Sequence, residues 1–218
     1  MAGILFIDMW PDVLPDGQLR ERYRDFPPRA QAHGRTILPL HFSRIVPAAM
    51  RANPPQAVVI SGSRTNLVDT LADDPEDGAL LGRFEAVTAL LAGLPPATPI
   101  LGICFGHQYL AKTAGGRLER MAQDREEDDF PLSESRPDPL LLGMGSPPRF
   151  VERHLWRVVE PGTGYQVVAR SSDGVEMVRH RTLPRVGVQF HPEYFAKQHP
   201  AGGLPDGRIF LDNWLSSL

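Results

Sequence analysis

The chain has 218 residues, of which 42% are hydrophobic and 22% are charged. These values are ordinary for a folded globular protein and exclude the hydrophobic-poor composition of disordered chains. A net charge of −3 with both signs interspersed gives no basic face, so we expect no nucleic-acid partner. The length suits one large α/β domain with a substantial core, and we expect residues 1–218 to form a single domain.

The amino-terminal stretch is apolar only as far as Asp8, too short for a signal-peptide core or a membrane span. We therefore expect a cytoplasmic protein with no membrane partner. The only cysteine is Cys104, which excludes an internal disulfide framework and a multi-cysteine metal site. Cys104 is thus either a buried structural thiol or a reactive one.

Four short apolar or β-branched runs in the first half of the chain predict buried parallel strands, at residues 3–7, 36–40, 57–60 and 99–103. Between the third and fourth runs, residues 75–94 have apolar side chains at helical spacing behind an acidic first turn. This strand–helix–strand pattern predicts an α/β fold, with an open, mostly parallel sheet flanked by helices.

The second half of the chain begins with a predicted helix at residues 105–114, which Gly115 and Gly116 end. Further runs predict strands at residues 155–159, 166–170, 175–179 and 186–190, and an amphipathic helix at 207–218. Residues 124–148, rich in acidic residues, proline and glycine, predict a long surface excursion. Its acidic run at 126–129 is most simply a solvated loop, and it could equally cover a site.

The segment around the cysteine reads Gly102-Ile103-Cys104-Phe105-Gly106, the spacing of the G-x-S-x-G nucleophile elbow. In such an elbow the nucleophile lies on a strained turn between a strand and a helix, and the glycines let the two backbones approach. The helix start contributes partial positive charge and free N–H groups, which favour a thiolate. Most single cysteines are small buried hydrophobes, but this context favours a reactive Cys104.

A base follows at the end of the last predicted strand, where residues 187–193 read Gly-Val-Gln-Phe-His-Pro-Glu. Open α/β sheets place their sites at strand ends, and in elbow enzymes the nucleophile precedes the histidine. His191 can take the thiol proton and return it to a leaving group, while Glu193 holds the imidazole tautomer. Alone, His-Pro-Glu would more often be a capped loop; with Cys104 it predicts a triad.

Residues 99–108 (PILGICFGHQ) and 187–193 (GVQFHPE) resemble the two signature segments of class I (triad) glutamine amidotransferases. Residues 59–63 resemble the family's oxyanion strand, and residues 153–158 resemble its Ser-His-x-x-x-Val segment. The likeness is closest to the amidotransferase domain of GMP synthetases. It implies a flavodoxin-like sheet and a cysteine-dependent reaction in which glutamine loses ammonia, forms a cysteinyl thioester and leaves as glutamate.

The same resemblance implies three groups of site residues. The catalytic residues would be Cys104, His191 and Glu193; the oxyanion donors would come from the backbone around Gly62, Ser63 and Phe105; and the substrate-binding residues would be Gln108, His154, Leu155 and Trp156. One departure concerns residues 61–64, which read Ser-Gly-Ser-Arg where the family has Ser-Gly-Gly-Pro, because serine resists a positive φ. Arg64 either faces an anionic group on a larger substrate or is a solvated loop arginine.

We expect neither a cofactor nor a metal site. The chain has no G-x-x-x-x-G-K-[ST] phosphate loop and no HExxH helix. The other histidines lack metal-ligand spacing with cysteine, so the default role of each is at the surface or in a hydrogen bond. These are His33, His41, His107, His180 and His199.

Three functions remain open. Because the chain ends about where an amidotransferase domain ends, the first is a glutaminase that supplies ammonia to a separate synthetase. The second is a free-standing γ-glutamyl hydrolase or transferase that cleaves a γ-glutamyl amide metabolite with the same triad. The third is a binding or regulatory protein whose site is silent, against which the intact Cys104, His191 and Glu193 argue.

Overall fold

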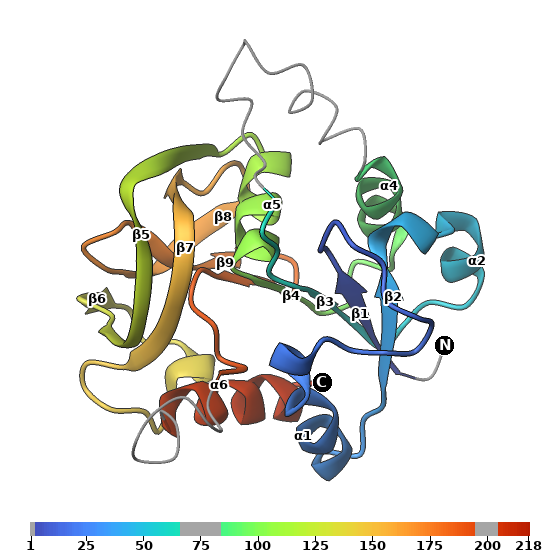
Figure 1. Ribbon diagram of the computed structural model, residues 1–218, viewed down its shortest axis with the longest axis horizontal. Helices are drawn as coiled ribbons and strands as arrows, with labels where there is room; N and C mark the ends of the chain where they lie inside the picture. Colours follow the sequence, from blue (N-terminus) through green and yellow to red (C-terminus); the bar gives the residue numbers. More distant parts are fainter. Residues whose placement is uncertain (1–2, 66–83, 195–204) are drawn as a thin grey trace.

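The computed structural model describes residues 3–65, 84–194 and 205–218, and its strands form one twisted sheet (Figure 1). In spatial order the sheet runs through β2 (Ile37–His41), β1 (Ile4–Asp8), β3 (Ala57–Ile60), β4 (Ile100–Ile103), β10 (Arg185–Val188), β9 (Val175–His180), β7 (Arg149–Glu160) and β5 (Arg117–Pro131). Two further strands extend it, because β8 (Tyr165–Arg170) pairs with β9 and β6 (Glu134–Ser135) pairs with β8. The first five strands in this order are parallel, whereas the pairs beyond β10 are antiparallel. The predicted open α/β sheet is confirmed.

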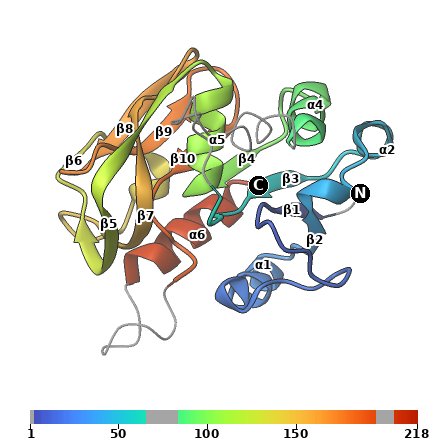
Figure 2. The same cartoon turned by 45° about the horizontal axis from the view of Figure 1, so that its top comes forward.

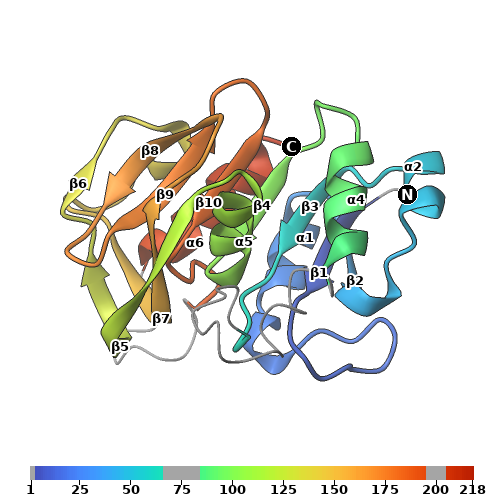
Figure 3. The ribbon, with the colours of Figure 1, turned by 90° about the horizontal axis from the view of Figure 1, so that it is seen from above.

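Helices cover both faces of the parallel half (Figures 2 and 3). On one face lie α2 (Pro47–Ala52), α4 (Glu85–Gly93) and α5 (Phe105–Thr113), and on the other lie α1 (Phe26–Ala32) and α6 (Pro205–Ser216). Strand β1 shows how the sequence produces two cores, because successive side chains of a strand point to opposite faces. Leu5 and Ile7 join the cluster under α4 and α5, while Ile4 and Phe6 join the cluster with α1 and α6.

The predicted strands are found at their expected places, with boundaries shifted by one or two residues; β7 begins six residues before the predicted 155. The C-terminal helix is α6, and the helix after the cysteine is α5. The helix predicted at 75–94 is observed as α4, and the part of that prediction before residue 84 lies outside the described residues. The sequence patterns predicted neither α1 nor α2, two short helices with proline in their first turn.

The expected surface excursion at 124–148 is wrong over its first third, because residues up to Pro131 belong to the edge strand β5. Acidic residues have low strand propensity, but an edge strand tolerates charges that face solvent and cross-strand partners. Such partners are present: Asp128 pairs with Arg153 and Asp129 pairs with Arg149, both on β7. The acidic run is therefore a paired strand rather than a solvated loop.

The described residues also form 3-10 turns: η1 (Glu21–Tyr23) follows the long connection after β1, and η3 (Pro139–Leu141) packs on α6. Another, η2 (Phe42–Arg44), follows β2. Among the described residues, none of the helices combines the length and the apolar character that a membrane-crossing helix needs.

Candidate active site

Cys104 lies on the turn between β4 and α5, at the carboxyl end of the parallel strands. Its backbone has φ 51° and ψ −101°, and it is the only non-glycine residue with a positive φ in the described part of the chain. Such a conformation costs energy for a residue with a Cβ and persists only where the surroundings impose it. Close packing of β4 against the start of α5 imposes this conformation on Cys104, because a Cβ on Gly102 would lie 2.5 Å from the Gly106 carbonyl oxygen.

The Cys104 side chain is 5% exposed and has polar neighbours from two other elements. Its Sγ lies 3.6 Å from the Arg153 carbonyl oxygen on β7 and 3.6 Å from the Gln189 amide nitrogen, which donates to it. Phe105 is the first residue of α5, so its N–H has no acceptor within the helix and adjoins the sulfur. The Gln189 N–H and the start of α5 thus place partial positive charge beside the sulfur, whereas the Arg153 carbonyl oxygen accepts from it.

His191 and Glu193 follow β10, the strand next to β4 in the sheet. The His191 Nδ1 and Glu193 Oε1 atoms are 2.7 Å apart, and both side chains are buried. The His191 backbone N–H donates to the Val151 carbonyl at 2.9 Å, and the Tyr194 ring stacks on the imidazole with centroids 4.9 Å apart. The imidazole is therefore held in position from three sides.

The charge state of His191 follows from its neighbours. Burial lowers its pKa, but the Glu193 carboxylate and the Cys104 sulfur, which both hydrogen-bond to the ring, raise the pKa to about 10. At neutral pH the ring is an imidazolium between two acceptors. An imidazolium beside a sulfur is the arrangement that activates cysteine nucleophiles in other enzymes.

The loop after β3 completes the front of the site. A Cβ on Gly62 would lie 3.2 Å from His191 Cε1 and 3.6 Å from Cys104 Cβ, so this backbone adjoins both side chains. The Gly62 carbonyl accepts from the Ser61 hydroxyl at 2.8 Å and from the Tyr23 hydroxyl at 3.3 Å. In a trans peptide the N–H points away from the carbonyl, so these bonds fix the direction of the Ser63 N–H.

The departure at Ser63 does not force a strained backbone. Ser63 is outside the positive-φ region, and its hydroxyl accepts from the Thr65 N–H at 3.0 Å, a local turn typical of serine. Ser63 and Cys104 line the same cavity of about 380 Å³. Its described walls come from several elements and consist of Trp10, Arg22, Ser63, Arg64, Thr65, Cys104, Gln108, Asp124, Arg125, Glu126, Arg153, His154, Leu155 and Trp156.

The expected substrate-binding residues gather on the β7 side of this cavity. Gln108, on the second turn of α5, donates from its amide to the Trp156 carbonyl at 2.7 Å and to Gln189 Oε1 at 3.2 Å. His154, Leu155 and Trp156 lie on β7 and line the same wall. Gln108 therefore ties the helix that follows Cys104 to the strand opposite it.

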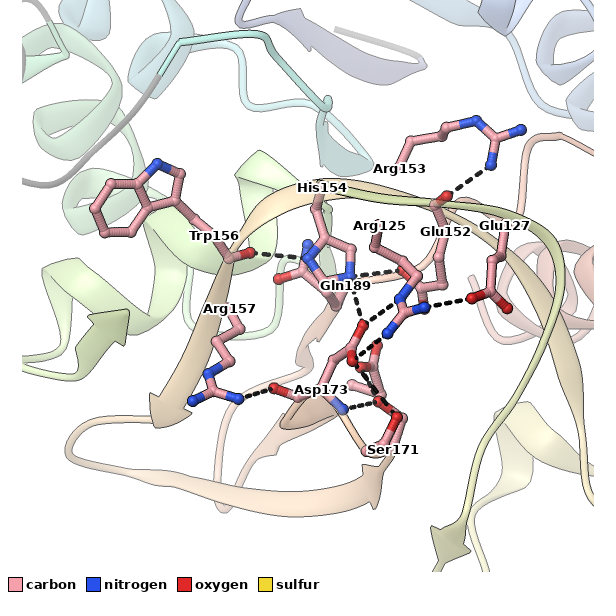
Figure 4. A network of polar contacts seen from close by, with 12 residues as sticks. Arg125, Glu127, Glu152, Arg153, His154, Trp156, Arg157, Ser171, Asp173 and Gln189 are labelled. Atoms are coloured by element: carbon pink, nitrogen blue, oxygen red, sulfur yellow. Dashed lines mark hydrogen bonds and ion pairs between the residues drawn. The ribbon is translucent and has the colours of Figure 1, made fainter. Parts of the chain in front are cut away.

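Behind this wall lies a buried polar network (Figure 4). The His154 Nε2 is 3.2 Å from Glu152 Oε2, and its Nδ1 is 3.1 Å from the Trp156 carbonyl. Glu176 on β9 accepts from the Ser171 hydroxyl at 2.5 Å. Asp173 receives two hydrogen bonds from Arg125, at 2.6 and 2.7 Å. The network joins β5, β7 and β9 immediately behind the β7 wall of the cavity.

Protons are needed to balance the charges of this network. Burial raises the pKa of Glu152 to about 8 and raises that of Glu176 well above its usual range, whereas burial lowers the pKa of His154. Within the described residues, no N–H group donates to the side-chain carboxyl of Glu152. The hydrogen bond between the Glu152 and Glu176 carboxyls therefore needs a shared proton, with His154 neutral.

Glu152, His154 and Glu176 are also the one group of the described residues whose ligand atoms, within 4.8 Å of one another, could hold a metal ion. A proton shared between the two acids balances the same negative charge without an ion. His154 Nδ1 donates to the Trp156 carbonyl, so the Nε2 lone pair of the neutral ring faces Glu152 Oε2, where a protonated carboxyl can donate to it. We assign no metal to the trio.

Of the remaining histidines, His107 is fully buried and its Nε2 contacts the Val175 carbonyl at 3.1 Å. Burial lowers its pKa to about 4, so it is neutral and packs in the core behind the elbow. His33, His41 and His180 each have hydrogen-bond partners, and His199 lies outside the described residues. The expected hydrogen-bonding role is thus found for four of the five.

The sequence patterns did not single out several residues that contact the site. Gln189 lies inside the GVQFHPE segment, and a polar side chain in a buried strand is the signal that could have found it. Tyr23 and Tyr194 lie in irregular segments without periodicity. The sequence patterns could not single out Glu152, because Glu176, the acid that shares its proton, lies on a different strand, β9.

The comparisons with known proteins decide the family. Residues 52–207 match the family described as glutamine amidotransferase class-I. The chain belongs to this family. The match covers the turn of Cys104, the strand of His191 and Glu193, and the β7 wall.

Individual relatives are similar over parts of the chain. A GMP synthase subunit of Thermococcus kodakarensis is 38% identical over 47% of this chain, and a GMP synthase of Thermus thermophilus is 31% identical over 74%. These matches span 55% and 28% of those proteins, so the chain covers about half or less of their length. An anthranilate synthase component 2 of Archaeoglobus fulgidus is 37% identical over 44% of the chain and 52% of its own.

Solved structures share the fold. A glutamine amidotransferase of Thermotoga maritima superposes with a TM-score of 0.64 at 18% identity, over 90% of this chain and 78% of the other. A glutamine amidotransferase of Methylobacillus flagellatus gives a TM-score of 0.64 at 16% identity, over 100% and 96%. At such identities the likeness shows the flavodoxin-like arrangement of this family and nothing finer.

Proposed function

We propose that the chain hydrolyses the side-chain amide of glutamine through a thioester on Cys104. The observation that carries this proposal is the convergence of a cysteine on a strained strand-to-helix turn with a buried His191–Glu193 pair at the end of the adjacent parallel strand. A structural cysteine needs neither the positive φ nor an imidazolium beside it.

The steps follow from the positions of the groups. The Cys104 sulfur attacks the γ-carbonyl carbon, and the oxygen that becomes negative is met by the Phe105 and Ser63 N–H groups. The C–N bond breaks while the His191 imidazolium gives its proton to the nitrogen, which leaves as ammonia. Water, deprotonated by the now neutral His191, attacks the thioester, and glutamate leaves as the thiolate is regenerated. Glu193 stabilises each imidazolium that forms.

The destination of the ammonia is part of the proposal. Relatives of this chain are named as subunits or components of GMP synthase, anthranilate synthase and aminodeoxychorismate synthase. By analogy with these names, a separate synthetase would accept the ammonia, either in a stable complex or transiently. The same triad would also serve a free-standing γ-glutamyl hydrolase or transferase, because a thioester forms equally from any γ-glutamyl amide whose amine can leave.

One experiment tests the proposal. The purified chain is incubated with glutamine and with γ-glutamyl amides while ammonia, amine and glutamate are measured, with Cys104→Ala as the control. Turnover that requires Cys104 is expected, and an electrophilic glutamine analogue should label Cys104 faster than it labels free cysteine at neutral pH. Absence of both Cys104-dependent turnover and enhanced labelling would contradict the proposal and favour the silent, regulatory function.

A further inference from the structure

The cavity extends beyond Cys104 on the side away from its β7 wall. Gln108, Leu155 and Trp156 line it from the β7 side, whereas Trp10 and Arg22 come from segments that follow β1. In the sheet, β1 and β7 lie on opposite sides of β4, the strand that ends at Cys104. An amide carbon held at the sulfur therefore has space on its far side for more than an ammonia molecule.

That far side carries Arg22, a cation for which no ion pair is found among the described residues. The Arg22 guanidinium lies 4.7 Å from the centre of the Trp10 ring and 5.2 Å from the centre of the Tyr194 ring. Tyr194 in turn stacks on His191, the group that would protonate the leaving nitrogen. Arg22 is therefore held by two aromatic faces next to the position of the leaving group. These contacts orient the guanidinium through its face, and among the described residues its N–H donors have no hydrogen-bond acceptor.

The nearby acids are already engaged by other arginines. Asp8 and Asp12 both pair with Arg20, at 2.9 and 2.8 Å, and Glu21 pairs with Arg24. Among the described residues, no carboxylate pairs with Arg22. A half-buried arginine on the wall of a cavity, without an acid of its own, is the feature expected of an anion-binding group.

A second arginine strengthens the positive potential at this end. Arg64 also lies over the Trp10 ring, 5.6 Å from its centre, and its contact with Asp12 is long, at 3.6 Å. Arg125 and Arg153, which line the opposite wall, are by contrast paired with Asp173 and Asp128. The opposite wall also carries the acids Asp124 and Glu126, so within the described residues the net positive charge of the cavity wall lies on the side of Arg22 and Arg64.

From this arrangement we propose that the site also accepts γ-glutamyl amides whose amine part carries a carboxylate, with Arg22 as the residue that binds this acid. The inference rests on the proposed thioester chemistry and concerns its substrate. The sulfur replaces the amine at the γ-carbon, the C–N bond breaks, and His191 gives its proton to the nitrogen. The products are an amino acid and, after water attacks the thioester, glutamate.

The test compares γ-glutamyl-glycine with γ-glutamyl-glycinamide, which differ only in the charge of the terminal group. For the unaltered chain, kcat/KM for the acid should exceed that for the amide by about tenfold, the effect of one charge-assisted hydrogen bond. In Arg22→Met the ratio should fall to about one, and in Arg22→Lys it should be intermediate. In Arg24→Met, which removes an exposed arginine of the same segment, the ratio should not change.

Binding to the Cys104→Ala variant gives the same comparison without turnover. Calorimetry should show the acid binding about tenfold more tightly than the amide, and this preference should be absent from Cys104→Ala/Arg22→Met. Two results would overturn this inference and leave the proposed function intact. One is hydrolysis of glutamine with no preference for the acid over the amide, and the other is a preference for the acid that survives Arg22→Met. Loss of all Cys104-dependent turnover and labelling would instead overturn the proposed function. An equal loss with both substrates in Arg22→Met would assign Arg22 a structural or partner-binding role.

Discussion

In the proposed mechanism, His191 is the residue whose charge decides whether the leaving group can be protonated. Its pKa of about 10 results from a balance in which burial opposes the charge while Glu193 and Cys104 support it. The proton that it gives to the leaving nitrogen is available below this pKa and is lost as the pH rises through it. The alkaline limit of the activity is therefore a property of the His191–Glu193 pair.

Glu193→Gln should move that limit to lower pH. The neutral amide keeps a hydrogen bond to the imidazole but removes the negative charge, so the pKa of His191 falls and the imidazolium is lost earlier. We expect the alkaline limb of the kcat/KM profile to shift down by about one pH unit or more, with a lower maximum. The profile is measured from about pH 6 to 10. An unchanged alkaline limb would show that another group sets it.

Under the proposed mechanism, Tyr23 would act on the reaction without touching the reacting atoms. Its hydroxyl holds the Gly62 carbonyl and so directs the Ser63 N–H, which makes it a positioning residue. Tyr23→Phe should lower kcat about tenfold, less than the loss of an oxyanion donor, and should change KM little. Tyr109→Phe removes a buried tyrosine hydroxyl that bonds to Thr88 and serves as the control. Equal effects of the two variants would rule out the positioning role.

At the scale of elements, the site depends on how closely α5 crosses β3 and β4. Gly106 is in the first turn of α5, and a Cβ there would lie 2.2 Å from the Ile60 carbonyl oxygen of β3. No side chain can yield in this contact, because the opposing atom belongs to the backbone of a central strand. The Cys104 turn and the strand carrying the Gly62 loop are thus fixed relative to one another through one glycine.

Gly106→Ala should destabilise the fold by about 3 kcal/mol, the upper range for an overpacked core, and should lower activity by displacing the elbow. Gly93→Ala is the matched control, because the nearest atoms there belong to the flexible Arg51 side chain. It should change the free energy of unfolding by less than about 0.5 kcal/mol. Denaturant melts of the two variants measure the difference. A Gly106→Ala protein as stable as the control would mean that the helix can shift.

The elements that sequence could predict are those whose side chains are apolar on a regular period. β1, β3 and β4 are continuous apolar runs because both faces are covered by helices, and the positions of Cys104 and His191 at neighbouring strand ends follow from that. β5 was missed because an edge strand can be almost entirely charged. Nothing local could place Arg22 or Tyr23 at the site, since tertiary packing brings their 3-10 turn there.

On the scale of the whole molecule, the parallel half supplies the reactive groups and the antiparallel extension supplies the wall that faces them. The two halves join in the sheet at β10 and β9. They also meet at the site through β7, where the Val151 carbonyl accepts from the His191 N–H and the Arg153 carbonyl contacts the Cys104 sulfur. The network of Glu152, His154 and Glu176 ties β7 to β9 behind these carbonyls. The stability of this part of the sheet is therefore linked to the proton that the two acids share.

Glu152 makes the stability of the protein depend on pH. Its pKa is about 8 in the fold, above the ordinary value of 4.5, so the folded chain keeps a proton that the unfolded chain has released. Its contribution to stability is fully present below pH 4.5 and is lost as the pH rises through 8. Between about pH 6 and 8 the free energy of unfolding should fall by about 2 kcal/mol.

Glu152→Gln should remove this decline. The amide cannot ionise, and its N–H₂ group can donate to Glu176, which then carries its charge without a shared proton. Urea melts at about pH 6 and 8 should show a fall in stability for the unaltered chain and little change for the variant. Glu134→Gln, at an exposed position of β6, should behave like the unaltered chain. A parallel decline in Glu152→Gln would mean that the lost proton belongs to another buried group, of which Glu176 is the nearest.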